Sequence, residues 1–188
     1  MARARRAWRR RQAGWDPARL IFLDESGAKT NLTRLRGRAQ RGQRLHAKSP
    51  QGHWHTTTMI SSIRWDGSSA CMAIDGAADT EVFRTYVREV LCPTVRPGDI
   101  VIMDNLPPHK NERTLSLLTG LGAEVLFLPA YSPDLNPIEK MWSKVKARLR
   151  TAEARTESAL IQAIGSALQS VTRQDALNWF ASCGYSFI

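Results

Sequence analysis

The sequence lacks the features of membrane proteins, disulfide-rich secreted proteins and repeat proteins. No apolar run approaches the roughly 20 residues that a membrane-spanning helix needs, and the arginine-rich N-terminus has no apolar segment of a signal peptide behind it. The three cysteines, Cys71, Cys92 and Cys183, are odd in number and widely spaced, which argues against a disulfide framework and a zinc knuckle. There is no internal repeat and no low-complexity segment. We therefore expect a soluble, cytoplasmic protein that does not bind membranes.

Acidic residues are also scarce. The chain has 17 Asp and Glu against 27 Lys and Arg, which gives a formal net charge of +10. Such an excess attracts polyanions, and phosphate neutralisation dominates nonspecific binding to nucleic acids. A nucleic-acid partner is therefore favoured over a merely basic surface. The length of 188 residues indicates one domain that buries roughly 70% of its unfolded surface.

The middle of the chain reads as strand, helix, strand, loop and helix. Ile100–Met103 and Val125–Leu128 are short apolar runs bounded by turn residues, as strands buried in an α/β sheet are. Asn111–Leu121, between them, has helical spacing. Asp104 directly follows the first of these strands, and Glu139 lies at the start of the last helix. Because ligands bind beyond the carboxyl ends of parallel strands, this is the layout of an active site.

The rest of the pattern supplies three earlier strands and three more helices. Leu20–Leu23 is predicted to be a strand that ends at Asp24, and a segment rich in β-branched residues follows it and pairs with the next segment as a hairpin. Three antiparallel strands followed by two strands joined through helices is the order of an RNase H-like fold. We therefore expect an α/β protein with a mixed five-stranded sheet flanked by helices. In that fold the first and fourth strands are parallel neighbours, which would bring Asp24 close to Asp104. The other predicted elements are strands at 56–63 and 70–74 and helices that begin at Asp79, Glu157 and Gln174.

Two basic segments show little periodicity. Residues 1–12 carry six arginines and are predicted to be a mobile arm or the remnant of a linker, which we extend to residue 19. Residues 28–53 are predicted to be a long basic loop, and loops of this length inside a compact domain are usually functional or disordered. We expect this loop to contact the phosphates of DNA through Arg34, Arg36, Arg38, Arg41 and Arg44.

Three motifs surround the acids. They are Phe22–Gly27 (Phe-Leu-Asp-Glu-Ser-Gly), Met103–Asn105 followed by His109, and Leu128–Glu139, which contains Tyr-Ser-Pro-Asp-Leu-Asn-Pro-Ile-Glu. Together they closely resemble a DDE transposase of the insertion sequence 630 family, the bacterial branch of the mariner superfamily. Between the second and third acids lie 34 residues, a spacing typical of this group. The resemblance covers residues 15–185, almost the whole chain.

The resemblance implies roles for particular residues. Asp24, Asp104 and Glu139 would be the catalytic triad and would bind two divalent ions, normally Mg²⁺ with Mn²⁺ as an alternative. Clustered carboxylates are the ligands that Mg²⁺ prefers, and two such ions suit the attacking and leaving oxygens of phosphodiester cleavage. Asn105 and His109 would be accessory residues.

The implied activity is DNA transposition. The catalytic domain, residues 20–188, would hydrolyse a strand at the transposon end and then direct the freed 3′-OH to target DNA, at TA dinucleotides and without a covalent protein intermediate. We expect a homodimer on DNA in a bacterial cell, associated with the nucleoid. The family's helix-turn-helix modules are not in this sequence and could be encoded separately. The alternatives are a noncatalytic DNA-binding remnant and another RNase H-like nuclease, such as a junction resolvase.

Each candidate acid also has a structural interpretation. Asp24 and Asp104 could be ordinary acids that start turns. Glu139 is the third residue of a helix that Asn136 would cap, and this is the pattern of a capping box. His109 could reach the scissile phosphate or could stabilise a turn.

The last helix of the middle region has one apolar stripe and one basic line. The stripe is predicted to be core rather than a surface for stacking on DNA. Lys146 and Arg150 lie on a line with Glu139, so they could lead phosphates away from the site or could form a solvated basic flank. The apolar stripe consists of Ile138, Met141, Trp142, Val145 and Leu149.

Overall fold

The computed structural model describes residues 2–46, 48 and 50–186. Residues 1, 187 and 188, at the outer ends of the predicted N-terminal linker (1–19) and catalytic domain (20–188), and residues 47 and 49 of the predicted basic loop lie outside the described residues. No described helix is long and apolar enough to cross a membrane. The main elements, in chain order, are α1 (Ala2–Gln12), β1 (Leu20–Lys29), β2 (Thr56–Arg64), β3 (Ser69–Asp75), α2 (Thr80–Tyr86), β4 (Ile100–Met103), α3 (Glu112–Thr119), β5 (Glu124–Phe127), α4 (Pro137–Ala152), α5 (Glu157–Gln169) and α6 (Arg173–Ser182).

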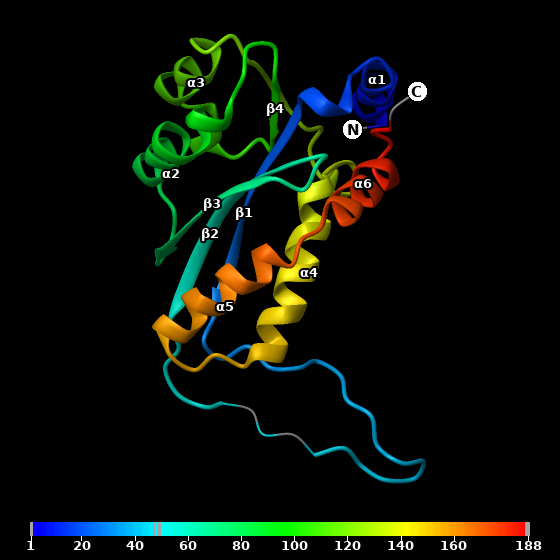
Figure 1. The fold of residues 1–188 in the computed structure, drawn as a ribbon, viewed down its shortest axis with the longest axis vertical. Helices are drawn as coiled ribbons and strands as arrows, with labels where there is room; N and C mark the ends of the chain where they lie inside the picture. The colour runs from blue at the N-terminus through cyan, green and yellow to red at the C-terminus, as the bar shows by residue number, and fades with distance from the viewer. Residues whose placement is uncertain (1, 47, 49, 187–188) are drawn as a thin grey trace.

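The five strands form one mixed sheet in the order β3-β2-β1-β4-β5. β2 pairs antiparallel with both β1 and β3, whereas β4 pairs parallel with both β1 and β5. Figure 1 shows β1 running through the middle of the molecule. This arrangement confirms the expected mixed five-stranded sheet, with the first and fourth strands side by side and parallel.

Helices cover both faces of the sheet. Because successive side chains of a strand point to opposite faces, Leu20 and Phe22 face one layer of helices while Ile21 and Leu23 face the other, and all four are fully buried. The first core contains residues of α4, α5 and α6, and the second contains residues of α2 and α3. In Figure 1 these two groups of helices lie on opposite sides of the sheet. The predicted apolar stripe of α4 is buried in the first core, which confirms its assignment.

β1 is longer than the sequence pattern indicated. The expected strand ended at Leu23, but β1 continues to Lys29 because its second half remains paired with β2. Asp24 therefore lies inside the strand rather than just past its end. Pairing with β4 stops two residues before Asp24, and Asp104 directly follows β4. Continuing that register sets the two acids beside each other.

The expectation of a mobile arm is wrong for residues 2–12, which form α1. Trp8 is only 6% exposed. Its Nε1 donates a hydrogen bond of 2.8 Å to the Tyr185 hydroxyl, which in turn donates one of 2.9 Å to the Leu135 carbonyl. Gln12 also donates to backbone carbonyls of the C-terminal segment. The helix is therefore fixed against the end of the chain and against the loop between β5 and α4. Figure 1 shows it beside α6.

Replacing Trp8 by phenylalanine tests this attachment. The variant keeps most of the buried ring but loses the hydrogen bond to Tyr185, so the free energy of unfolding should fall by about 0.5–1.5 kcal/mol. Urea unfolding measures the change. Trp54 is 51% exposed, and Trp54→Phe is the control, with an expected change within about 0.5 kcal/mol. Equal stability of Trp8→Phe and the parent would show that α1 is not held as described.

The chain between β1 and β2 extends from the sheet as a long loop whose described residues form no helix or strand (Figure 1). The base of the loop is fixed, because Arg155 donates hydrogen bonds to the carbonyls of Thr30 and Leu32 at 3.1 and 2.7 Å. Arg155 lies between α4 and α5, so the loop begins beside the C-terminal end of α4. All five arginines predicted to contact DNA are exposed on this loop.

Candidate active site

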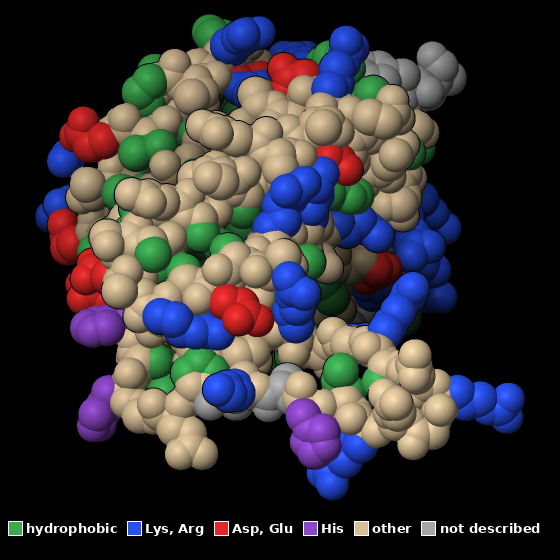
Figure 2. Space-filling model, turned by 60° about the horizontal axis from the view of Figure 1, so that its bottom comes forward, with side chains coloured by type: hydrophobic (Ala, Val, Ile, Leu, Met, Phe, Trp, Pro, Cys, Tyr) green, Lys and Arg blue, Asp and Glu red, His purple; other side chains and the backbone are tan. Residues whose placement is uncertain are grey.

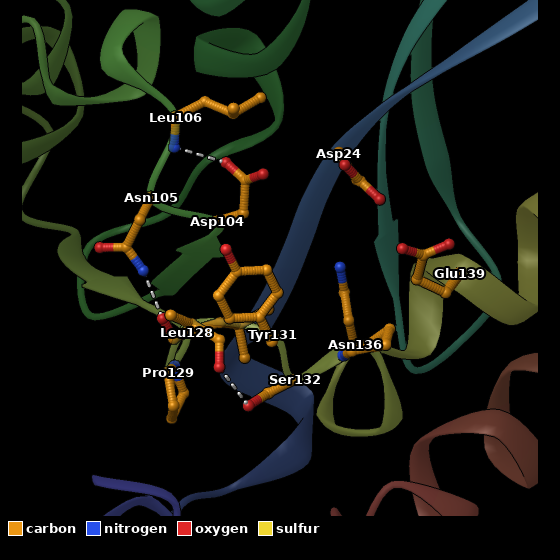
Figure 3. Close-up of a pocket in the computed structure, with 12 residues that line it drawn as sticks. Asp24, Asp104, Asn105, Leu106, Leu128, Pro129, Tyr131, Ser132, Asn136 and Glu139 are labelled. Carbon is orange, nitrogen blue, oxygen red and sulfur yellow. Dashed lines mark hydrogen bonds between the residues drawn. The ribbon is translucent and has the colours of Figure 1, made fainter. Parts of the chain in front are cut away.

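A pocket of about 500 Å³ opens where β4 and β5 end, against β1 and the first turn of α4. Asp24, Asp104 and Glu139 all line it. Figure 3 shows Asp104 on one side of the pocket and Asp24 with Glu139 on the other. The loop between β5 and α4 completes its wall with Tyr131 and Asn136. Three acids that lie far apart in the sequence therefore face one cavity.

Asp24 has an unusually basic carboxylate. Burial raises its pKa, the hydrogen bond of 2.8 Å from the Glu25 N–H to Oδ1 opposes the rise, and the negative charges of Glu139 and Asp104 add to it. The resulting pKa is about 7. Burial and the neighbouring carboxylates therefore both disfavour the ionised form of Asp24.

His109 supports Asp104 from behind the pocket wall. Its Nδ1 lies 2.6 Å from Asp104 Oδ1, and its Nε2 lies 3.6 Å from Glu25 Oε1. Neither ring nitrogen has a hydrogen bond of good geometry, so we describe both contacts as ion pairs. The ring is fully buried and lies 4.3 Å from the Phe83 ring, centroid to centroid. A ring buried in this way cannot touch a phosphate in this conformation.

These contacts shift the pKa values of both partners. Burial alone would lower the pKa of His109, but the carboxylates of Asp104 and Glu25 outweigh it and raise that pKa to about 9. For Asp104, burial acts to raise the pKa, but the contact with His109 and the hydrogen bond from the Leu106 N–H bring it below its usual value. Asp104 is therefore ionised at neutral pH.

The capping box predicted at the start of α4 is absent. The Asn136 side chain makes no capping hydrogen bond, although the residue occupies the N-cap position of the helix. The Glu139 side chain is exposed and lines the pocket. Local sequence favours the box, but the side chains of both residues line the pocket instead. The structure therefore removes the main structural interpretation of Glu139.

Asn105 has a different position from the acids. It is exposed, and its Nδ2 donates a hydrogen bond to the Leu128 carbonyl. This bond joins the chain just after β4 to the chain just after β5. Asn105 therefore lines the pocket as part of its wall.

The three acids suit a hard divalent cation in their chemistry. Carboxylate oxygens are the ligands that Mg²⁺ selects, and a bound cation would offset the charges of Glu139 and Asp104 that add to the raised pKa of Asp24. Within residues 2–46, 48 and 50–186, no three His, Cys, Asp or Glu side chains approach closely enough to hold an ion as they stand.

The predicted phosphate-contacting residues form two groups. Lys146 and Arg150 are half-buried on α4, which runs from the pocket at its N-terminus to the base of the long loop. The arginines of the loop continue from there (Figure 1). Figure 2, turned so that the loop comes forward, shows Lys and Arg side chains both on the loop and on the neighbouring surface of the domain. Lys146 and Arg150 therefore lie between the pocket and the arginines of the loop.

Sequence reasoning missed three features of this site. Glu25 faces His109, and its place directly after Asp24 was the available signal. Arg5 of α1 donates hydrogen bonds to Ser132 and to both carboxylate oxygens of Asp134, so α1 holds the loop that leads to Glu139. No local pattern indicates this contact. The third feature is the Asn136 side chain, which does not cap α4 although the sequence pattern suggested that it would.

The stability of the metal-free protein should depend on pH through Asp24. Its pKa is about 7 in the folded state and 3.8 in the reference state, so the folded protein holds the proton more tightly between these values. The free energy of unfolding should therefore fall as pH rises from about 4 to about 7. His109, whose pKa is raised from 6.5 to about 9, should extend the decline to higher pH.

Urea unfolding of Asp24→Asn should show a flatter profile of stability against pH below pH 7. Asp75→Asn, a change at an exposed acid at the end of β3, should keep the parental slope. An unchanged slope in Asp24→Asn would contradict the assignment.

Comparison with known proteins is consistent with this geometry. A family model described as "DDE superfamily endonuclease" matches residues 19–161. The Tcb1 transposase of Caenorhabditis briggsae is 26% identical over 187 residues, which cover 90% of this chain and 67% of that protein. The Tc1 transposase of Caenorhabditis elegans is 29% identical over 90 residues, which cover 48% of this chain and 33% of that protein. The structure of the Mos1 transposase paired-end complex with the left transposon end has a TM-score of 0.73 at 17% identity, over 98% of this chain and 61% of that one.

The matches define what the chain shares with these proteins. It spans between a third and about two thirds of the length of the curated relatives. The structural likeness shows a common RNase H-like fold, and the family model covers most of the chain. The chain therefore belongs to the DDE superfamily of endonucleases.

Proposed function

We propose that this chain is the catalytic domain of a transposase that cuts DNA at the ends of a mobile element and joins the freed end to target DNA. The observation that carries the proposal is that Asp24, Asp104 and Glu139 line one pocket in a chain of the DDE superfamily. In the first step a water oxygen attacks phosphorus and the bond to the 3′ oxygen breaks, which leaves a 5′-phosphate and a 3′-OH. In the second step that 3′-OH attacks a target phosphodiester, and a 3′-OH of the target strand is released.

We propose that the three acids bind two divalent cations, Mg²⁺ or Mn²⁺. When bound, such ions activate the attacking oxygen and stabilise the leaving one. The set of three carboxylates that line one pocket supports this assignment. His109 acts as a positioning residue. It keeps Asp104 ionised and oriented, as residues that contact metal ligands commonly do. Leu128, Pro129 and Tyr131 form part of the pocket wall beside the three acids.

Nicking of supercoiled plasmid DNA tests the proposal. The chain should convert supercoiled plasmid to open circles only when Mg²⁺ or Mn²⁺ is present. Products in which a labelled 3′ end has joined the plasmid would identify a transposase, whereas nicking without joining would identify a plain nuclease. Binding of DNA without any nicking would identify the chain as a noncatalytic DNA-binding remnant.

We propose that Lys146, Arg150 and the five arginines of the long loop contact DNA phosphates. The affinity for duplex DNA should then fall steeply with salt, with a slope of log affinity against log salt of about −0.9 per contact. Replacing both Lys146 and Arg150 by alanine should make the slope shallower by up to about 2. Arg88→Ala is the control, because this exposed arginine lies on the face covered by α2 and pairs with Glu89. Fluorescence anisotropy over a range of salt concentrations gives the slopes, and an unchanged slope in the double variant would exclude both residues as contacts.

The remaining assignments rest on the resemblance to the insertion sequence 630 family. We propose that residues 1–19 belong to a linker and 20–188 to the catalytic domain. We also propose that the chain acts as a homodimer on transposon ends, together with a separately encoded helix-turn-helix part and in the bacterial nucleoid. Light scattering of the chain with and without DNA tests the dimer.

A further inference from the structure

Asn136 differs from the N-cap residues of α2, α3, α5 and α6. It has the extended backbone of an N-cap residue, with φ −113° and ψ 100°, yet its side chain accepts no hydrogen bond from the first turn of α4. Asn111 occupies the same position in α3 and accepts a hydrogen bond of 3.2 Å from the backbone of that helix. Asparagine is among the preferred N-cap residues because of this bond. The other helices with side-chain caps begin after Asp79, Thr156 and Thr172.

The uncapped side chain is buried and faces the pocket. Asn136 is only 4% exposed, and its Oδ1 has no hydrogen-bond partner among the described residues. Figure 3 shows the amide directed into the pocket between Tyr131 and the two acids Asp24 and Glu139. A buried polar group without a partner is costly, and in native proteins such groups commonly pair with water or with a ligand. The amide is therefore placed for a partner that enters the pocket.

The amide lies where a phosphate could be held once bound cations offset the charge of the three acids that line the pocket. The pocket lies at the N-terminal end of the 16-residue helix α4, where backbone N–H groups and the helix dipole attract negative charge. A phosphodiester, with the water bound to it, offers an acceptor to the amide Nδ2 and a donor to Oδ1.

We propose that Asn136 contacts the substrate directly, and that its Nδ2 donates a hydrogen bond to a non-bridging oxygen of the DNA phosphate that reacts in the pocket. The proposal rests on the function proposed above. The missing cap is consistent with it, because the Asn136 side chain is directed into the pocket and not to the first turn of α4. A residue with only a capping role would accept a hydrogen bond from the first turn of the helix and would have no polar atom left for the pocket.

Paired substitutions separate the two roles. Asn136→Ala removes no cap, so its melting temperature without DNA should match or exceed that of the parent. Its rate of plasmid nicking at saturating DNA should fall on the order of 100-fold, the usual effect of losing one donor to a reacting group. The affinity for DNA should change less than about twofold, because the other phosphate contacts remain. Asn111→Ala, the matched control, should melt at a lower temperature and nick at the parental rate.

Asn136→Asp distinguishes a contact from a structural role. Aspartate is an equally good N-cap residue, so it would rescue a structural role and raise the melting temperature. As a contact it should fail, because a carboxylate repels the phosphate, and nicking should fall at least as far as in Asn136→Ala. Parental nicking by either variant would overturn the proposal. So would a drop in Mg²⁺ affinity in Asn136→Ala, which would make Asn136 a metal ligand.

A spectroscopic readout keeps this inference separate from the proposed function. The side-chain NH₂ signal of Asn136 should shift in ¹⁵N NMR spectra when a short DNA duplex is added with Ca²⁺ in place of Mg²⁺. The signal of Asn111 should not move. If the parent failed to nick DNA, the proposed function would fall, whereas an unmoved Asn136 signal in a chain that binds DNA would overturn only the contact.

Discussion

Asp104→Asn is expected to abolish metal-dependent cleavage of DNA while leaving the binding of DNA nearly intact. Asparagine has almost the same shape as aspartate but lacks the charge that a divalent cation requires. The loss should exceed about 1,000-fold, since both the capture of the cation and the stabilisation of the transition state depend on that charge. The phosphate-contacting residues on α4 and the long loop are unchanged, so anisotropy should report an affinity close to that of the parent.

Controls distinguish this result from misfolding. Asp24→Asn should lose cleavage in the same way, whereas Asp75→Asn should cut at the parental rate. The pKa of His109 should fall in Asp104→Asn, because the carboxylate that chiefly raises it is gone. This pKa can be followed by NMR. If Asp104→Asn retained cleavage, Asp104 would not belong to the catalytic triad, and an equal loss of binding and cleavage would indicate an unfolded protein.

Glu139→Gln is expected to have the second-largest effect. In the structure the Asn136 N–H donates its hydrogen bond to the Pro133 carbonyl and not to Glu139, so the substitution removes no capping hydrogen bond. Without metal, the melting temperature should stay the same or rise, because one of three mutually repelling carboxylates has been neutralised. Added Mg²⁺ should stabilise the variant much less than the parent, since a ligand that binds only the folded state stabilises it in proportion to its affinity. Plasmid nicking should be lost.

The matched control for this variant is Glu157→Gln. Glu157 lies in the first turn of α5, as Glu139 does in α4, but it lies away from the pocket. Loss of its charge should weaken the interaction with the helix dipole by about 0.3–1 kcal/mol and leave nicking unchanged. If Glu139→Gln behaved like this control and still cut DNA, Glu139 would be only a helix-terminal acid.

Local patterns predicted the elements around the site well. Ile100–Met103 was predicted with the bounds that β4 has, because a short apolar run between turn residues has few other uses. β5 was displaced by one residue. The neighbouring positions of Asp24 and Asp104 followed from the order of strands, and the register between β1 and β4 confirms them. These predictions succeeded because short apolar runs mark the buried strands, and the order of strands and helices along the chain indicates the fold.

The features that sequence reasoning missed depend on distant contacts. The second half of β1, Asp24–Lys29, has little strand propensity and is held by its pairing with β2. α1 looks like a charged tail, because only Trp8 and Gln12 of its residues are buried, and their partners lie at the other end of the chain. The capping box at Asn136 was a sound local prediction that the pocket overrides. In each case the deciding partner lies far away in the sequence.

Anomalous diffraction from crystals soaked in Mn²⁺ tests the central claim most directly, because it locates the ions that the three acids are proposed to bind. We expect two peaks between Asp24, Asp104 and Glu139, with the carboxylates drawn together around them, and no such peaks in crystals of Asp104→Asn. Crystals of the parent with no Mn²⁺ in this pocket, or with the ions bound elsewhere, would contradict the assignment of these acids as a metal-dependent catalytic site.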